Sequence, residues 1–140
     1  MVAWPPVSQT YHSWYTSTVS SAPYESREPV LRVVFYRSGS GREPVREWLK
    51  DLERDERKAI GEDIKTAQYG WPLGMPLIRK LDPALWEIRS SLAAGIARVV
   101  FAIDGDTMVL LHGFVKKSRK TPVNDIDTSR RRLARLLEEE

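Results

Sequence analysis

The sequence predicts an α+β domain, in which a helical hairpin packs on a small, mainly antiparallel sheet in the order β-α-α-β-β-β-α. Two apolar runs with β-branched residues flank Asp104-Gly105, a dipeptide typical of a short hairpin turn. Two consecutive helical patterns precede these runs, and a third follows them. The 140 residues are enough for one such domain with a hydrophobic core.

The domain is expected over residues 30–140, with residues 1–29 forming an N-terminal extension. From Met1 to Ser26 the chain has one charged residue, Glu25, and is rich in serine, threonine and aromatic side chains. This stretch has neither a helical nor an alternating period, which is typical of a segment outside a core. Its aromatic residues favour partial docking on the domain or on a partner.

A strand and a helical hairpin are predicted in the first half of the domain. Val30–Ser38 is β-branched and aromatic and ends in the turn SGSG, so we expect a strand there. Pro44 suits the first turn of a helix. Apolar residues then recur at helical spacing in two patterns, the second ending at Gly70: Val45, Trp48, Leu49 and Leu52, then Ala59, Ile60, Ile64 and Ala67. The loop GWPLGMP follows.

Three strands and a helix are predicted in the second half. The strands are Leu85–Ser91, Gly95–Asp104 and Asp106–Lys117. Thr121 can cap the following helix, and Pro122 can occupy its first position. The helix has an apolar stripe, formed by Ile126, Leu133 and Leu137. The basic run SRRRLAR (Ser129–Arg135) is interpreted as its solvated face.

The composition argues against several classes of protein. Without cysteine there is neither a disulfide nor a catalytic thiol, which fits a reducing cytoplasm. Two histidines, His12 and His112, are too few for an ordinary structural zinc site. No apolar run is long enough to span a bilayer, and no signal peptide is recognised, so we expect a cytoplasmic protein that does not bind membranes.

Charge is divided unevenly along the chain. Residues 43–65 have eight acids and six bases, whereas residues 79–120 have eight bases and four acids. Such a division can steer a polyanion onto one face of a protein. Four of the bases follow the last predicted strand with no acid among them: Lys116, Lys117, Arg119 and Lys120.

Strand alternation sorts the polar residues of the predicted sheet between its faces. Glu87 and Arg89 share one face of their strand, with Leu85. Arg98 lies between Ile96 and Val100, where a charge is costly unless it is paired or borders a cleft. In the last strand a common side is expected for Leu110, His112, Phe114 and Lys116.

Two interpretations of these cations stay open. In the functional one, arginine forks and lysines surround a concave surface of the sheet and bind phosphate, while an aromatic ring stacks on a base. The cations are Arg89, Arg98, Lys116 and Lys117, and the ring is that of Phe114, Phe101 or Trp86. In the structural one, Arg89 pairs with Glu87 or Asp106, and the lysines are a solvated strand end. His112 is more often structural in such a strand than a general acid–base.

Three motifs together resemble the HigB-type, phage-derived branch of the RelE/ParE toxin superfamily. They are LWEIRSS, ARVVFAI and LLHGFVKKSRKTPVNDI, in this order. The resemblance covers roughly Val30 to Leu137 and depends most on the lysine pair, the Thr-Pro dipeptide and the arginine-containing strand. The superfamily has a helical hairpin packed on a small antiparallel sheet, in agreement with the predicted order of elements.

The resemblance implies the toxin of a type II toxin–antitoxin pair. Such a protein is an endoribonuclease that cuts mRNA on the translating ribosome, and a HigA-like antitoxin with a helix-turn-helix domain neutralises it. Cleavage would need no metal or cofactor, because the ribose 2′-oxygen attacks the adjacent phosphate. We assign transition-state stabilisation to Arg89 and Arg98, and proton transfer to Lys116 or Lys117. Contacts with RNA are expected from Lys80, His112, Phe114, Arg119 and Lys120.

Two positions depart from the branch, and two other functions stay open. Ala97 precedes Arg98 where relatives often have an aromatic residue, and no tyrosine follows Tyr69, so Phe114 is expected to stack instead. ParE-type members bind DNA gyrase and do not cut RNA, and fold alone does not separate the two activities. A basic face would also support salt-sensitive nucleic-acid binding without catalysis.

Overall fold

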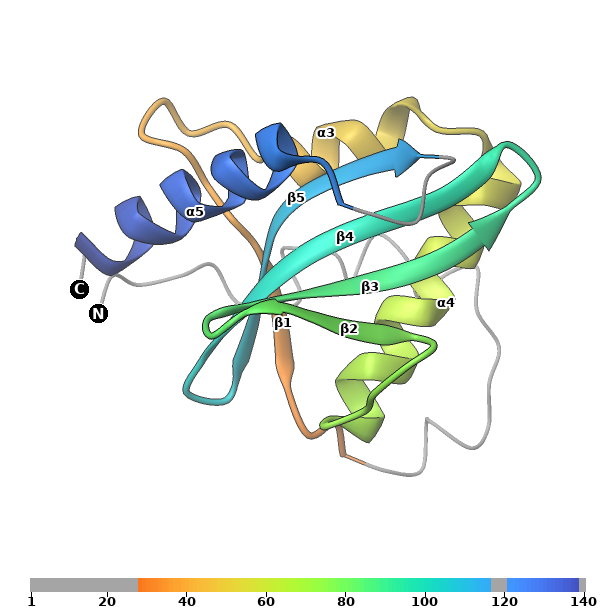
Figure 1. Ribbon diagram of the computed structural model, residues 1–140, viewed down its shortest axis with the longest axis horizontal. Helices are drawn as coiled ribbons and strands as arrows, with labels where there is room; N and C mark the ends of the chain where they lie inside the picture. Colours follow the sequence, from red (N-terminus) through yellow and green to blue (C-terminus); the bar gives the residue numbers. More distant parts are fainter. Residues whose placement is uncertain (1–27, 117–120, 139–140) are drawn as a thin grey trace.

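The computed structural model describes residues 28–116 and 121–138. They form a five-stranded sheet with helices on both faces (Figure 1). The elements are β1 (Arg32–Phe35), α3 (Pro44–Asp51), α4 (Arg54–Gly70), β2 (Ile78–Asp82), β3 (Leu85–Leu92), β4 (Gly95–Asp104), β5 (Thr107–Lys116) and α5 (Val123–Glu138). The order across the sheet is β1-β5-β4-β3-β2, with β1 parallel to β5 and the other neighbours antiparallel. The predicted α+β class is confirmed.

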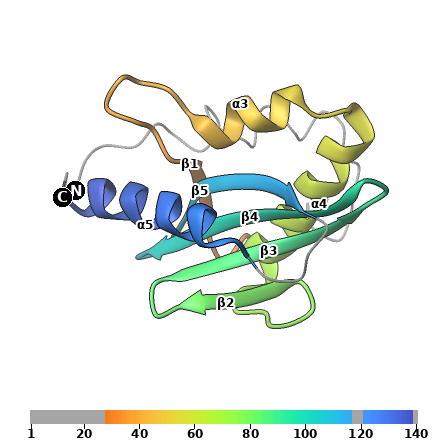
Figure 2. The same ribbon diagram turned by 45° about the horizontal axis from the view of Figure 1, so that its top comes forward.

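Helices α3 and α4 cover one face of the sheet, which we call the hairpin face (Figure 2). Helix α3 begins at Pro44, and α4 ends at Gly70, both as predicted. A side-chain oxygen of Glu56 accepts the amide of Glu53 at 3.3 Å and caps the start of α4. The apolar stripes of both helices are buried on this face, and they include Val45, Leu49, Ile60, Ile64 and Ala67.

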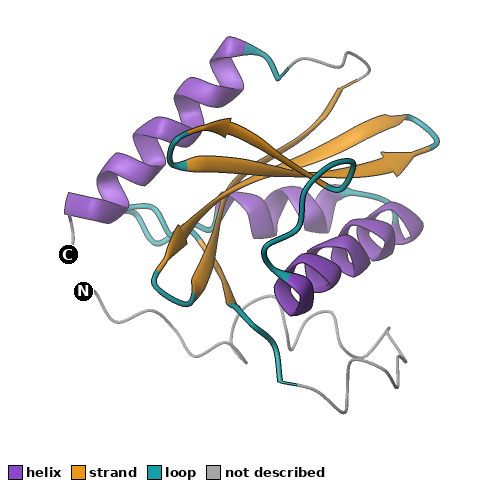
Figure 3. Cartoon of the chain, turned by 60° about the horizontal axis from the view of Figure 1, so that its bottom comes forward, coloured by secondary structure: helices purple, strands orange, loops and turns teal. Residues whose placement is uncertain are grey.

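Helix α5 packs on the opposite face, which we call the α5 face (Figure 3). Leu133 and Leu136 meet a smaller apolar cluster there, formed by Val34, Tyr36, Leu85, Val100, Ala102, Val109 and Leu111. This cluster fills only part of the face. The joined ends of β3 and β4 reach beyond the N-terminal end of α5 (Figure 1). No described helix is long and apolar enough to cross a membrane.

Strand β2 corrects the predicted order, which becomes β-α-α-β-β-β-β-α. Its sequence, IRKLD, has three charged residues and no β-branched run, so the local pattern does not indicate a strand. It forms because Ile78 pairs with Ile88 and extends the sheet beyond β3. An edge strand needs fewer apolar residues than a central one, since water reaches one of its sides.

A β-bulge corrects the predicted face of Leu110. Leu110 pairs with Phe101 and belongs to the core of the hairpin face, whereas His112 pairs with Val100 on the α5 face. Leu111 is the extra residue between them, and it shifts the alternation of β5 by one. Phe114 and Lys116 therefore share the α5 face with His112 but not with Leu110.

The ends of β1, β5 and α5 also differ from the predicted ones. Strand β1 covers only Arg32–Phe35. The β4–β5 turn consists of Gly105 and Asp106, with Asp104 paired to Thr107 and Gly105 in the left-handed region at φ +63°. Helix α5 begins at Val123, one residue after the expected start at Pro122. The hydroxyl of Thr121 donates a hydrogen bond to Glu87 of β3.

Candidate functional site

Three arginines from neighbouring strands converge on the α5 face around one carboxylate. Arg79 of β2 is opposite Glu87 of β3, and Arg89 of β3 is opposite Arg98 of β4. Directly opposed residues of antiparallel strands have side chains on the same face and in reach of one another. We call these four residues the arginine cluster.

The buried part of the cluster is held together by Thr121, just ahead of α5. The Thr121 hydroxyl donates to Glu87 Oε1 at 2.6 Å and accepts a hydrogen bond from Arg98 Nη1 at 3.1 Å. Both charged side chains are fully buried, at 0 % exposure. A single hydroxyl thus joins a buried cation to a buried anion and ties the start of α5 to β3 and β4.

The electrostatics of the cluster are unbalanced in favour of positive charge. Burial lowers the pKa of Arg98, and the charges of Arg89 and Arg79 act in the same direction, while Glu87 and, more weakly, Asp125 oppose them. Arginine keeps its charge in proteins, so the cluster presents three cations against one carboxylate. Glu87 offsets the cost of burying Arg98, and the other two arginines give the face a net positive potential.

Arg89 is the member of the cluster that links the buried pair to the surface. Its Nε lies 3.9 Å from Glu87 Oε2, and its side chain is 15 % exposed. The predicted Arg89–Glu87 pair is present, as the structural interpretation expected. This pairing does not exclude a ligand, because a guanidinium has five N–H donors in a fixed fork.

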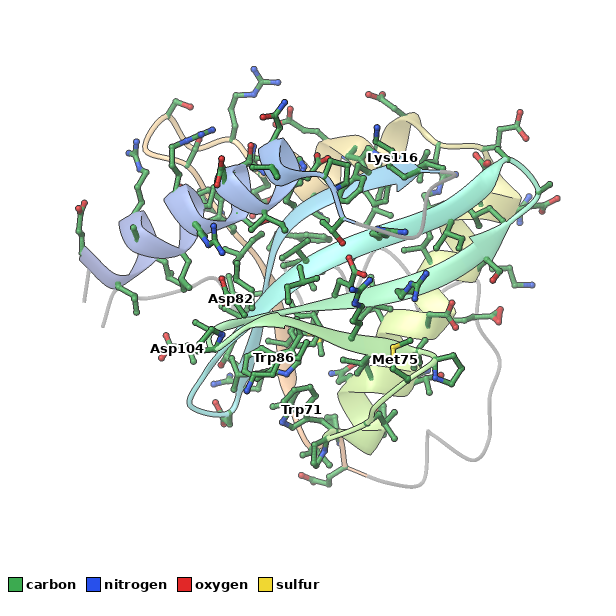
Figure 4. All side chains as sticks on the ribbon, viewed as in Figure 1. Trp71, Met75, Asp82, Trp86, Asp104 and Lys116 are labelled. Atoms are coloured by element: carbon green, nitrogen blue, oxygen red, sulfur yellow. The ribbon has the colours of Figure 1, made fainter. Side chains whose placement is uncertain are left out.

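Lys116 and Phe114 extend the same face across β5. Phe114 is opposite Arg98, and Lys116 is opposite Ile96, which is itself opposite Ser91 of β3. Lys116 is exposed at the end of its strand, far from Trp71 and Trp86 (Figure 4). The ring of Phe114 is half-buried and stacks on His112, with centroids 5.4 Å apart. An exposed cation and an aromatic ring therefore border the cluster.

His112 is engaged by two side chains of α5. Arg132 Nη1 donates to His112 Nδ1 at 3.2 Å, so that nitrogen accepts and the ring proton is on Nε2, which donates to Asp125 Oδ1 at 2.7 Å. Arg132 Nη1 also donates to the carbonyl of Leu111 at 2.7 Å. Burial lowers the pKa of His112; the bond to Asp125 opposes this, and the charge of Arg132 adds to it. A neutral His112 thus clamps α5 to the sheet.

The other predicted site residues are placed apart from the cluster or are not described. Lys80 lies on the hairpin face, with its Nζ 5.5 Å from the centre of the Trp86 ring, and Trp86 stacks on Phe101 there. Lys117, Arg119 and Lys120 lie outside the described residues. Their chain neighbours Lys116 and Thr121 are both on the α5 face.

Sequence patterns missed four contributors to this face: Arg79, Thr121, Asp125 and Arg132. The position of Arg79 on this face was not predicted, because the sequence of β2 has no strand-like pattern. Arg132 belongs to the run interpreted as solvated, yet it is half-buried against His112. Asp125 and Arg132 are seven residues apart, a spacing that places two side chains on the same face of a helix. This spacing could have indicated that both contact the same residue of the sheet.

Within the described part of the chain, no three side chains of His, Asp or Glu gather as ligands for a metal ion. Guanidinium groups lie at the base of the α5 face, and an exposed lysine and an aromatic ring lie at its border. Such a face can bind phosphate oxygens and stabilise charge that develops on them.

The family described as phage derived protein Gp49-like (DUF891) matches residues 47–134, a span from α3 through most of α5 that includes the whole arginine cluster. No curated protein matches the chain.

Proposed function

The chain belongs to the Gp49-like family of phage-derived proteins, a family associated with the toxins of toxin–antitoxin systems, and from this premise we propose that it is a HigB-type endoribonuclease acting on mRNA. Membership implies an antitoxin as partner. We further propose that this antitoxin is HigA-like with a helix-turn-helix domain, and that the toxin cuts mRNA on the translating ribosome in the bacterial cytoplasm.

One observation carries the proposal: the arginine cluster lies on the part of the α5 face that the apolar cluster under α5 does not fill. A protein that only needed a stable sheet could place apolar side chains there, because the desolvation of buried charges is costly even when the charges are paired. Positive charge in excess of the buried carboxylate instead suits a polyanion. The bordering ring of Phe114 suits an unpaired base, which stacks on aromatic side chains.

The proposed reaction is a transesterification within the RNA. The ribose 2′-oxygen loses its proton to a base and forms a bond to the adjacent phosphorus. The bond from phosphorus to the 5′-oxygen breaks, and an acid protonates that oxygen. The products are a 2′,3′-cyclic phosphate and a 5′-hydroxyl. We assign the acid and base to Lys116 and Lys117 and the stabilisation of the phosphate charge to the arginines.

The two arginines have different parts in this proposal. Arg89 reaches the surface and can donate directly to a phosphate oxygen. Arg98 is fully buried and held by Thr121, so it acts from beneath through its charge and by fixing Glu87. Its removal would leave Glu87 buried without that counter-charge, a loss of about 3–5 kcal/mol for buried pairs. Arg98→Ala would therefore mix catalysis with unfolding, and Arg89 is the cleaner target.

The test is to map mRNA 5′ ends after brief induction in bacteria. Wild type is compared with Arg89→Ala and Lys116→Ala, and with Lys80→Ala as a matched control, since that cation lies on the hairpin face. We expect new ends inside translated frames with wild type and Lys80→Ala. Both site variants should lose them while staying folded, with a melting temperature lowered by about 5 °C at most.

Adding the purified protein to a cell-free translation reaction, with translation running or blocked, separates the two parts of the proposal. Ends that disappear when translation is blocked support action on the ribosome, whereas ends that persist support cleavage of free mRNA. Growth arrest with intact mRNA and soluble protein overturns the nuclease assignment. Arrest with DNA damage in its place would favour a gyrase target.

A further inference from the structure

A hollow of about 480 Å³ opens beside the arginine cluster, at the edge of β3. Its size is within the range of small-ligand sites, roughly 300–1,000 Å³. It is lined by Asp63, Pro76, Leu77, Arg89, Ser91 and Ile96. Arg89 belongs both to the cluster and to this lining, so a ligand that binds the cluster can reach the hollow without leaving the protein surface.

The hollow exists because the chain turns away from β3 before β2 begins. The pairing of the two strands starts at Ile78, whose amide bonds to Gly74 in a turn, and the amide of Arg89 bonds to the carbonyl of Leu77. Peptide groups of a strand alternate in direction, so Ser91, two residues on, points its N–H and C=O to the same edge. Its N–H and C=O therefore face the hollow.

The walls of the hollow differ in chemistry. Pro76, Leu77 and Ile96 are apolar and suit the face of a flat ring. Asp63 of α4 contributes a carboxylate, and burial raises its pKa; a hydrogen bond with the Ser90 side chain opposes this, and the neighbouring charge of Glu62 adds to it. A half-buried carboxylate gains from a ligand that donates hydrogen bonds to it, because such bonds are charge-assisted.

We propose that this hollow is a base-selecting subsite for RNA, and that it selects guanine next to a phosphate bound by Arg89. This inference rests on the proposed function and adds a specificity to it. Guanine has two adjacent donors, N1–H and the 2-amino group, that match the two oxygens of the Asp63 carboxylate. Its O6 can accept from the Ser91 amide, while the ring packs between the apolar walls.

Other bases fit this arrangement less well. Adenine and cytosine offer one exocyclic donor beside a ring acceptor, which would face the carboxylate and repel it. Uracil offers one donor between two acceptors. The path to the cluster is continuous, because Ser91, Ile96 and Lys116 are opposite one another across three strands. An RNA strand can therefore pass from Lys116 across Arg89 to the hollow.

The experiment compares the base composition around each mapped cut between wild type and Asp63→Asn. This substitution keeps the shape of the side chain but replaces one of its two acceptor oxygens by a donor. We expect guanine at one fixed position beside most wild-type cuts, and Asp63→Asn should reduce this preference by about tenfold, the effect of one lost charge-assisted hydrogen bond. Asp55→Asn is the control, since Asp55 is an exposed acid of the same helix outside the hollow.

A second arm does not depend on the folding of a variant. A reporter mRNA is made with the selected guanines changed to adenine by synonymous codons and is exposed to the wild-type protein. Cleavage at those sites should fall by a similar factor while other sites are still cut.

Cuts with no base preference, or a preference unchanged by Asp63→Asn, overturn the subsite and leave the nuclease standing. The absence of all cuts overturns both. An Asp63→Asn protein that cuts with unchanged preference but no longer binds its antitoxin would assign the edge of β3 to a partner strand and overturn the inference.

Discussion

Ile88 and Arg89 are neighbours in β3, yet they enter different surroundings. Ile88 is fully buried under α4 in the large apolar core of the hairpin face. Arg89 points to the α5 face, beside Glu87 and opposite another arginine. One strand thus divides its residues between a face that stabilises the fold and a face that collects charge.

The difference teaches how a small sheet can hold a charged site without losing its core. Period-two alternation separates the two sets of side chains completely, so polar residues on one face do not interrupt apolar packing on the other. The α5 face also buries its charge in pairs: Glu87 and Arg98 are both fully buried and share the Thr121 hydroxyl. The buried charges are tolerated because they are paired, and the excess positive charge lies toward the surface.

The largest expected effect comes from substituting the two neighbours in parallel. Ile88→Ala should destabilise the protein by about 2–5 kcal/mol, because it leaves a cavity between β3 and α4. Arg89→Ala removes a partly exposed side chain and should cost about 1 kcal/mol or less. Urea unfolding of the two variants measures both values. Arg89→Ala should lose RNA cleavage, whereas the residual folded Ile88→Ala should cleave normally.

Equal destabilisation by Ile88→Ala and Arg89→Ala would contradict the proposed difference between the two faces, since Arg89 would then be a structural residue. Ser91→Ala is a suitable companion, because Ser91 is an exposed residue of the same strand and face. It should change the stability by less than about 0.5 kcal/mol.

The hairpin face could be predicted from the sequence, and the reasons are local. Pro44 set the start of α3, and the spacing of Ile60, Ile64 and Ala67 set the buried side of α4. β4 was predicted with its observed ends. In each case the period of the apolar residues coincides with the period of the element, so burial and local preference agree.

The α5 face could be predicted only in part, because its features depend on contacts between distant segments. Alternation indicated that Arg89 and Arg98 were unusual, and they are opposite each other. The bulge at Leu111 left no local signal, and β2 forms through pairing with β3 despite its charged sequence. Thr121 was expected to cap a helix, but its hydroxyl bonds to Glu87, 34 residues away in the sequence.

A smaller effect is expected from the hydroxyl that joins the buried charges. Thr121→Val keeps the shape but leaves Glu87 and Arg98 without their shared partner, and should cost about 1–3 kcal/mol. Thr121→Ser keeps the hydroxyl and should restore most of this stability. Thermal unfolding measures the difference between the two variants, and cleavage assays should show the same order.

Thr128→Val is the matched control for that pair. Thr128 also donates its hydroxyl, but to the carbonyl of Asn124 within α5, at 3.0 Å. Its loss should change the stability by less than about 1 kcal/mol. If Thr121→Val and Thr128→Val have the same effect, the bridge between Glu87 and Arg98 contributes nothing beyond an ordinary threonine hydrogen bond.

The smallest expected effect is the dependence of stability on pH through His112, which joins the two regions of the α5 face. Burial lowers the pKa of His112 below its usual value of 6.5. The unfolded chain therefore binds a proton at this position at a higher pH than the folded one does. The stability from the neutral ring is fully present above about pH 6.5 and is lost as the pH falls through the lowered pKa.

The sign follows from the contacts as well. Protonation of Nδ1 removes the acceptor for Arg132 and places two cations side by side, while the bond to Asp125 persists. Melting temperatures between pH 5 and 7.5 should fall more steeply for wild type than for His112→Gln. Parallel curves for the two proteins would mean that the clamp does not respond to protonation. A steeper fall for the wild type would identify His112 as the group through which acid loosens α5 from the sheet.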